Sequence, residues 1–190
     1  MSELPDYLRP PEPQSLSMSY ELGTAGWASL HLKCGETEFT IPDVGYLTDG
    51  LGDVVRAALS LVTGASHVEV LFDGEPQVWG LMIEPAGLAD ADPPRLRICR
   101  MIVKDGGWGL TDAGHSNKPV WLWQSPILFE GHIRSDDLGK AVLAMAEAVR
   151  EEFDDATYRE RWGHYASLEG FPLRGMIALK AALAITEFRA

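Results

Sequence analysis

The residues best suited to chemistry lie in one glycine-rich segment, residues 105–118. Asp112, His115 and Ser116 supply a carboxylate, an imidazole and a hydroxyl, which a hydrolytic site uses as acid, base and nucleophile. That chemistry needs the groups held within hydrogen-bonding distance, and a glycine-rich loop holds side chains loosely. Asp112 and His115 are therefore the catalytic candidates, and a hairpin loop without chemistry is the alternative interpretation.

The histidines do not form a recognisable metal site. All five are widely separated along the chain: His31, His67, His115, His132 and His164. His67 and Glu69 alternate on one face of a predicted strand, but two ligands are too few to define a metal centre. The sequence also lacks the nucleophile elbow, the P-loop, the HExxH pair and the dinucleotide-binding glycine pattern. We therefore expect no metal, no cofactor and no enzymatic activity.

The most unusual property of the chain is its formal net charge of −12. Between residues 36 and 92, Arg56 is the only lysine or arginine. Such a charge repels nucleic acid and anionic membranes, and it would steer a basic protein partner toward the surface. A solvated surface without a partner is the alternative interpretation. The candidate partner-binding residues are Asp49, Asp53, Glu69, Asp73 and Glu75.

Two of these carboxylates belong to a predicted helix over about residues 47–63. Its apolar residues recur every three or four positions: Leu47, Leu51, Val54, Val55, Ala58, Leu61 and Val62. Thr48 or Asp49 can cap the first turn, and Gly64 stands where a glycine ends a helix. Asp49 and Asp53 fall on the opposite stripe. Changing both to lysine is therefore expected to abolish binding of a basic partner without harming the fold.

The remaining pattern predicts an α+β fold. Turn residues separate strand-like segments at 21–33 (bent at Gly26), 37–41, 67–72, 78–84, 96–103 and 120–129. Their short connections favour a mainly antiparallel sheet. Helices are predicted from the N-cap Ser135 to Phe153, over 157–165, and from Phe171 onward. The buried side of the last helix is predicted to be Leu173, Met176, Ile177, Leu183, Ile185 and Phe188.

Length and composition indicate one domain over residues 18–190, preceded by an extended or disordered proline-rich leader over 1–17. The start of the chain has no signal-peptide pattern, and no apolar run is long enough to cross a membrane. The two cysteines, Cys34 and Cys99, lie in strand-like runs and form no CxxC pair. Buried free thiols and a cytoplasmic location are expected, with a disulfide between them as the alternative.

Large aromatic residues gather in two places. Trp121 and Trp123 share one face of a predicted strand, and Tyr158, Trp162 and Tyr165 recur at helical spacing. Such residues fill the core between a sheet and its helices, and they also anchor protein interfaces. The sequence leaves open whether Trp121, Trp123 and Trp162 belong to the core or to an interface, including that of a homodimer.

Two segments resemble a family of conserved hypothetical proteins from bacteria that has no assigned activity. One runs from Tyr46 to Leu59, and the other joins Tyr158–Trp162 to Gly170–Arg174. The resemblance implies a cytoplasmic bacterial protein. Small acidic α+β proteins of bacteria include immunity proteins that block basic toxins, which is an analogy of size and charge. We therefore expect a non-enzymatic binding protein with an acidic docking surface. The alternative is a small-molecule-binding protein or hydrolase with its site at residues 105–118.

Overall fold

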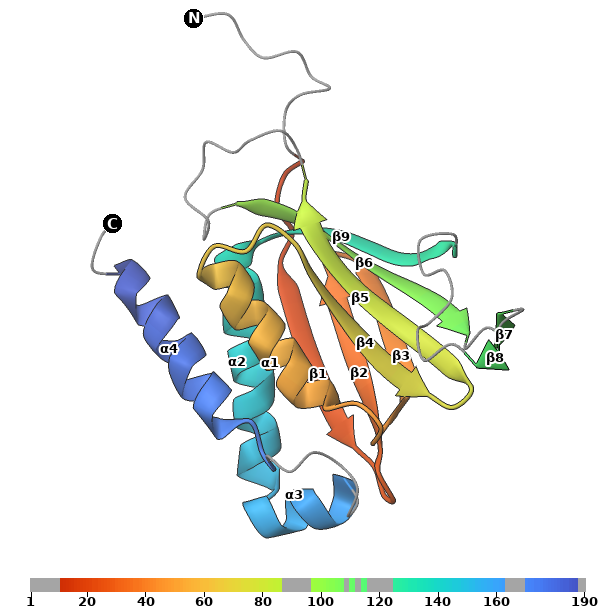
Figure 1. The fold of residues 1–190 in the computed structure, drawn as a ribbon. Helices are drawn as coiled ribbons and strands as arrows, with labels where there is room; N and C mark the ends of the chain where they lie inside the picture. The colour runs from red at the N-terminus through yellow and green to blue at the C-terminus, as the bar shows by residue number, and fades with distance from the viewer. Residues whose placement is uncertain are drawn as a thin grey trace, which may run out of the picture.

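The fold has two antiparallel sheets with helices packed on one side (Figure 1). The computed structural model describes residues 11–86, 97–107, 110–111, 114–115, 125–162 and 170–187. One sheet has the order β1–β2–β3 and the other has the order β4–β5–β6–β9. The strands are β1 (Leu16–Leu22), β2 (Trp27–Cys34), β3 (Thr37–Gly45), β4 (Val68–Gly74), β5 (Gln77–Pro85), β6 (Ile98–Gly107), β7 (Leu110–Thr111), β8 (Gly114–His115) and β9 (Ile127–Arg134). The helices are α1 (Gly50–Val62), α2 (Ser135–Glu152), α3 (Asp155–Trp162) and α4 (Leu173–Glu187). The predicted α+β class is confirmed.

The core lies between the inner faces of the sheets and the helices. Along β2 the side chains of Ala28, Leu30, Leu32 and Cys34 are buried, and they alternate with more exposed residues. The two sheets meet at Phe39 of β3, whose ring lies 6.2 Å from that of Phe129 in β9. Helix α1 packs against β4 and α2 packs against β1, so the helices cover the side of the core that the sheets leave open.

Helix α1 forms as the sequence predicts. Asp49 is its N-cap, and its side chain accepts a hydrogen bond from the backbone N–H of Gly52. Gly64 follows the helix with φ of 124°, a conformation that favours glycine. Leu51 and the predicted apolar residues after it are buried. Leu47 is 56% exposed, because the helix begins only at Gly50.

The predicted single strand over 21–33 is wrong, since β1 and β2 form an antiparallel hairpin there. The chain reverses at Ala25 and Gly26, which have φ of 56° and 82°. The N–H of Gly23 donates to the carbonyl of Trp27 at 2.8 Å and closes the turn. A bend at Gly26 was expected, but the left-handed Ala25 beside it gives no signal in the sequence.

The segment predicted as a leader overlaps the sheet, because β1 begins at Leu16. Just before it, the N–H of Gln14 donates to the carbonyl of His132 in β9 at 2.7 Å. The side-chain oxygen of Gln14 accepts from the N–H of His132 at 3.0 Å. Residues 1–10 lie outside the described part of the chain.

The start of α2 also differs from the prediction. Strand β9 continues to Arg134, five positions beyond the predicted strand end at residue 129, and residues 120–124 lie outside the described residues. Ser135 is the first residue of α2 rather than its N-cap, and Arg134 in the capping position makes no side-chain cap. The hydroxyl of Ser135 instead donates to the carbonyl of Arg97 at 3.2 Å, which ties α2 to the start of β6.

The predicted buried side of helix α4 is confirmed in part. Met176 is buried and Leu173 and Leu183 pack against the core, whereas Ile177 and Ile185 are exposed and Phe188 lies outside the described residues. Met176 and Leu179 are buried at 5% and 0% exposure, whereas Ile177 and Ile185 are 62% and 58% exposed. The reason is that α1 and α2 both pack on the same side of α4. Its opposite side therefore leaves Ile177 and Ile185 uncovered by the described residues, together with the charged Arg174 and Lys180.

Two further expectations can be compared with the structure. Cys34 and Cys99 are both free and buried, so no disulfide joins them. No helix in the described ranges combines the length and the hydropathy that a membrane crossing requires.

Candidate functional site

The acidic residues of α1 are engaged within the fold. The Asp49 side chain is only 11% exposed, and its Oδ2 lies 3.0 Å from the Arg56 guanidinium. The same guanidinium lies 2.6 Å from Asp53. Burial raises the pKa of the Asp49 carboxyl, although the bonds from Arg56 oppose that rise. The expectation that Asp49 belongs to an exposed docking stripe is therefore wrong, because Asp49 caps α1 and holds Arg56.

The other predicted docking residues lie at the β4–β5 hairpin. Asp73 is 5% exposed, and its carboxylate accepts a hydrogen bond from the N–H of Glu75 at 3.0 Å. Asp73 therefore shapes the turn and offers little surface to a partner. Glu69 and Glu75 are exposed, and neither carboxylate forms an ion pair with a described residue.

The catalytic candidates of the 105–118 segment lie largely outside the described residues, so the site stays a prediction. Asp112 and Ser116 lie outside the described residues, as do Trp121 and Trp123. The backbone of His115 pairs with Leu110 in the short β7–β8 ladder. Asp105, at the start of the segment, accepts a hydrogen bond from the side chain of Gln77 at 3.0 Å.

The aromatic residues of α3 belong to the core. Tyr158 and Trp162 are 1% and 2% exposed, and their rings stack with centroids 6.5 Å apart. Tyr20 of β1 joins them, with its ring 6.2 Å from that of Trp162. Tyr20 is not predicted from the sequence, because a single tyrosine beside a predicted leader carries no periodic signal.

This aromatic cluster contains polar atoms without partners. No described residue hydrogen-bonds the Tyr20 hydroxyl, the Tyr158 hydroxyl or the indole N–H of Trp162. Burial raises the pKa of both tyrosines, and the nearby Asp49 carboxylate raises it further. Folded proteins pair more than about 90% of their buried polar groups, so three orphaned donors in one cluster are unusual.

A cavity of about 500 Å³ lies beside this cluster, between the first turns of α1 and α4. Asp49, Gly52 and Arg56 line it at α1, and residues 170–175 line it at the start of α4 and just before that helix. Phe171 belongs to the wall of the cavity and packs edge-on against Tyr158 at 5.1 Å. The ring of Tyr158 therefore lies against this wall. The first turn of α4 contains no acidic residue.

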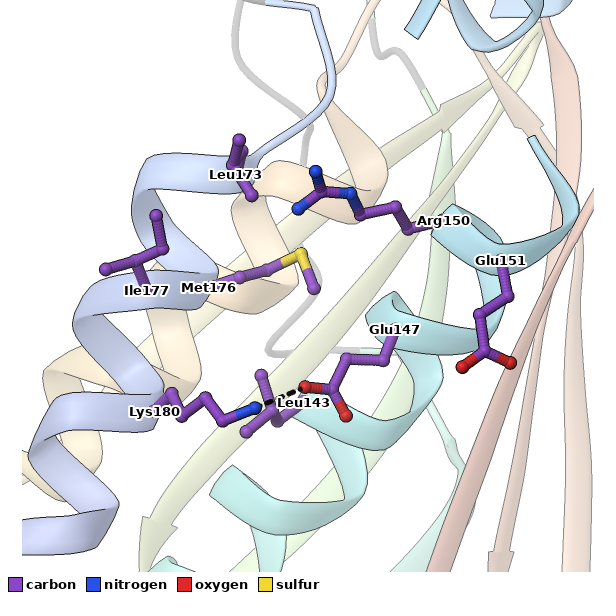
Figure 2. A pocket seen from close by; sticks show the side chains of 8 residues that line it. All are labelled: Leu143, Glu147, Arg150, Glu151, Leu173, Met176, Ile177 and Lys180. Atoms are coloured by element: carbon purple, nitrogen blue, oxygen red, sulfur yellow. Dashed lines mark hydrogen bonds and ion pairs between the residues drawn. The ribbon is translucent and has the colours of Figure 1, made fainter. Parts of the chain in front are cut away.

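A second depression of about 530 Å³ runs between α2 and α4 (Figure 2). Its apolar floor contains Leu143 of α2 together with Leu173 and Met176 of α4. Charged residues of both signs border it: Glu147, Arg150, Glu151 and Lys180. The ammonium of Lys180 lies 3.1 Å from the Glu147 carboxylate and links the two helices.

Exposed carboxylates gather where α2 meets α3. We call Glu151, Glu152, Asp154, Asp155 and Glu160 the acidic corner, and all five are exposed. Asp154, the residue before α3, accepts a hydrogen bond from the N–H of Thr157 at 2.7 Å, and this bond lowers the pKa of Asp154. Glu152 and Glu160 form no ion pair with any residue in the described ranges.

The outer face of the second sheet carries a cross-strand ion-pair network. Arg100 of β6 donates to both oxygens of Glu130 in β9, at 2.8 and 3.2 Å. It also donates to Glu84 of β5 at 3.3 Å. The hydrogen bond from Arg100 lowers the pKa of Glu130. Sequence analysis missed this network because its members are far apart along the chain.

The described residues contain no group of three or more histidine, cysteine, aspartate or glutamate side chains placed to hold a metal ion. Three features of the described residues are candidate sites for a ligand or partner: the α1–α4 cavity, the α2–α4 groove and the acidic corner. No protein family, no curated protein and no solved structure matches the chain.

Proposed function

We propose that the protein is a non-enzymatic binding protein that holds a basic segment of another protein at its acidic corner. One observation carries this proposal. Glu152 and Glu160 lie in the last turns of α2 and α3, and no described residue forms an ion pair with either carboxylate. The C-terminal end of a helix carries partial negative charge, so a carboxylate in the last turn is electrostatically unfavourable.

A cationic partner relieves this unfavourable arrangement. Each carboxylate at a helix C-terminus is disfavoured by about 0.3–1 kcal/mol at low ionic strength, and a lysine or arginine placed against it reverses that effect. The net charge of −12 also attracts a basic partner from a distance. Because salt screens exposed charges beyond about 10 Å at 0.1 M, the interaction is expected to weaken in salt.

The test is affinity capture from native lysate at low and high salt, with the wild-type chain and with Glu152→Lys/Glu160→Lys. Lysine is favourable in the last turn of a helix, so the double variant is expected to remain folded. A matched control is Glu69→Lys/Glu75→Lys, which reverses two exposed charges at the β4–β5 hairpin. We expect a salt-sensitive partner that binds the wild type and the control and is lost from the corner variant. A partner that the corner variant retains, or no salt-sensitive partner at all, contradicts the proposal.

A second candidate function is the binding of a small molecule in the α1–α4 cavity. The orphaned donors of Tyr20, Tyr158 and Trp162 favour it, because a guest with acceptor oxygens would complete their hydrogen bonds. Phe171 separates the cavity from Tyr158, so such a guest must displace the Phe171 ring.

This candidate is tested by adding small oxygen-rich acids and alcohols one at a time and measuring NMR chemical-shift perturbation. A true ligand shifts the signals of Gly170–Gly175, and its affinity falls in Tyr158→Phe but not in the control Tyr46→Phe. Perturbations that remain unchanged in Tyr158→Phe would show that the ligand does not reach the buried donors, and this candidate would then fail.

A further inference from the structure

Helix α4 presents an apolar stripe to solvent. Four exposed apolar residues lie on one side of this helix: Ile177, Ala181, Ala184 and Ile185. Residues three or four positions apart share one side of a helix, as Ile177 and Ala181 do, and as Ala181 does with Ala184 and Ile185. The isoleucines are 62% and 58% exposed, although isoleucine is among the residue types most often buried. The alanines leave room for another helix to approach closely, because their side chains are short.

The α2–α4 groove lies beside this stripe. Figure 2 shows Met176 pointing from α4 toward α2, while the exposed Ile177 lines the groove at its α4 edge. A projecting isoleucine and an open apolar groove are therefore adjacent on the same face. A partner with the same two features would fill the groove with its own isoleucine.

The charges around the groove indicate which partner fits. Two acidic residues, Glu147 and Glu151, and two basic residues, Arg150 and Lys180, border it. This rim is balanced in charge, whereas the whole chain carries a net charge of −12. A strongly basic partner would meet Arg150 and Lys180, and a strongly acidic one would meet the two glutamates. A second copy of this chain brings both signs in equal number.

We propose that two copies of the chain associate through the α4 stripe and the α2–α4 groove. A two-fold axis relates the copies, and Ile177 of each copy enters the groove of the other. Such an isologous contact also allows Arg150 of one copy to pair with Glu151 of the other, since neither forms an ion pair with a described residue of its own chain. The dimer contact shares Glu151 with the acidic corner, but Glu152 and Glu160, which carry the proposed function, take no part in it.

The first test measures the mass of the full-length chain by sedimentation equilibrium over a range of concentrations. The wild type is expected to reach twice its chain mass of 20.8 kDa. Ile177→Asp places a charge in an apolar contact, and it is expected to weaken dimerisation by about tenfold to a hundredfold. The matched control is Leu47→Asp, because Leu47 is also exposed, at 56%, but precedes α1 and is not part of the α4 stripe or the groove. A wild type that stays monomeric, or a dimer that Ile177→Asp leaves unchanged, overturns the proposal.

A second test does not depend on a destabilising change. Cys34 and Cys99 are buried, so a cysteine introduced at the exposed Ala184 is the accessible thiol among the described residues. A short thiol-specific cross-linker is expected to join two copies of Ala184→Cys in high yield. The control Ser66→Cys, at an exposed position after α1, is expected to cross-link poorly. Equal yields for the two variants would mean that the stripe is not an interface.

Discussion

The carboxylate of Asp49 lies 3.0 Å from the guanidinium of Arg56, two turns further along α1. Its other oxygen accepts a hydrogen bond from the N–H of Gly52 at 3.3 Å. The Asp49 side chain therefore caps α1 and also neutralises Arg56, which is the only lysine or arginine between residues 36 and 92. Because its side chain is only 11% exposed, Asp49 has little area to offer a partner.

Loss of the Asp49 cap is expected to destabilise the protein. Asp49→Ala should lower the free energy of unfolding by about 1 kcal/mol, since the N–H of Gly52 loses its acceptor. Asp49→Asn should cost less, because the amide oxygen can still accept that bond. Urea unfolding measures both changes. Equal stability of the alanine variant and the wild type would show that the cap contributes nothing.

The Asp49 carboxyl also makes stability depend on pH. Burial raises its pKa in the folded chain above the unfolded value of about 3.9. The folded state therefore holds this proton more tightly, and the contribution of Asp49 to stability falls as pH rises from the unfolded pKa through the folded one. Urea unfolding of the wild type and Asp49→Asn at several pH values in this window isolates the contribution. The stability of the wild type relative to the variant should increase as pH falls, and a difference that stays constant would contradict the raised pKa.

The orphaned hydroxyl of Tyr158 gives the third prediction. Because no described residue bonds this buried hydroxyl, Tyr158→Phe should leave the free energy of unfolding of the ligand-free protein unchanged or slightly raised. By comparison, Trp162→Ala should cost about 3–5 kcal/mol, since it empties a large core position. Thermal or urea unfolding distinguishes them. A loss of about 1 kcal/mol or more in Tyr158→Phe would mean that a bound water or ligand completes the hydroxyl's hydrogen bonds.

The Arg100 network gives the fourth prediction. The hydrogen bond from Arg100 lowers the pKa of Glu130, so Arg100→Gln should raise that pKa toward its ordinary value. Carbon-detected NMR titration of the Glu130 carboxyl measures it. Glu84→Gln is the control, because Glu84 contacts Arg100 without touching Glu130 in the hydrogen-bond network. No change of the Glu130 pKa in Arg100→Gln would show that the pair does not persist in solution.

Gly45 gives the fifth prediction. Gly45 ends β3, which packs beside β4. A Cβ atom at this position would lie 2.7 Å from the backbone carbonyl oxygen of Asp73 in β4. Backbone cannot move aside as a side-chain end can, so Gly45→Ala should lower the free energy of unfolding by about 1–3 kcal/mol. Gly139→Ala is the matched comparison, since its Cβ would meet methyl groups of Val62 and Leu183. Its cost in urea unfolding should be smaller, and a cost equal to that of Gly45→Ala would contradict the argument.

Features that depend on neighbouring residues could be predicted from the sequence. The cap at Asp49, the apolar stripe and the final Gly64 all lie within one short segment, and α1 forms as they indicate. The β4–β5 hairpin and the apolar face of α2 follow from local pattern in the same way. The hairpin of β1 and β2 was missed, because it depends on a left-handed conformation at Ala25, a residue type that rarely adopts it.

The candidate surfaces were decided by the tertiary structure. Periodicity shows that α4 is apolar, but only the positions of α1 and α2 determine that Leu179 is buried while Ile177 is exposed. Arg100 and Glu130 meet only because β6 and β9 are neighbours in the sheet. Sequence by itself determined the α+β class, the helix α1 and the acidic charge, since these depend on residue types and on interactions within a few positions. Which side chains face solvent depends on contacts between segments that are distant in the chain, and those contacts exist only in the folded protein.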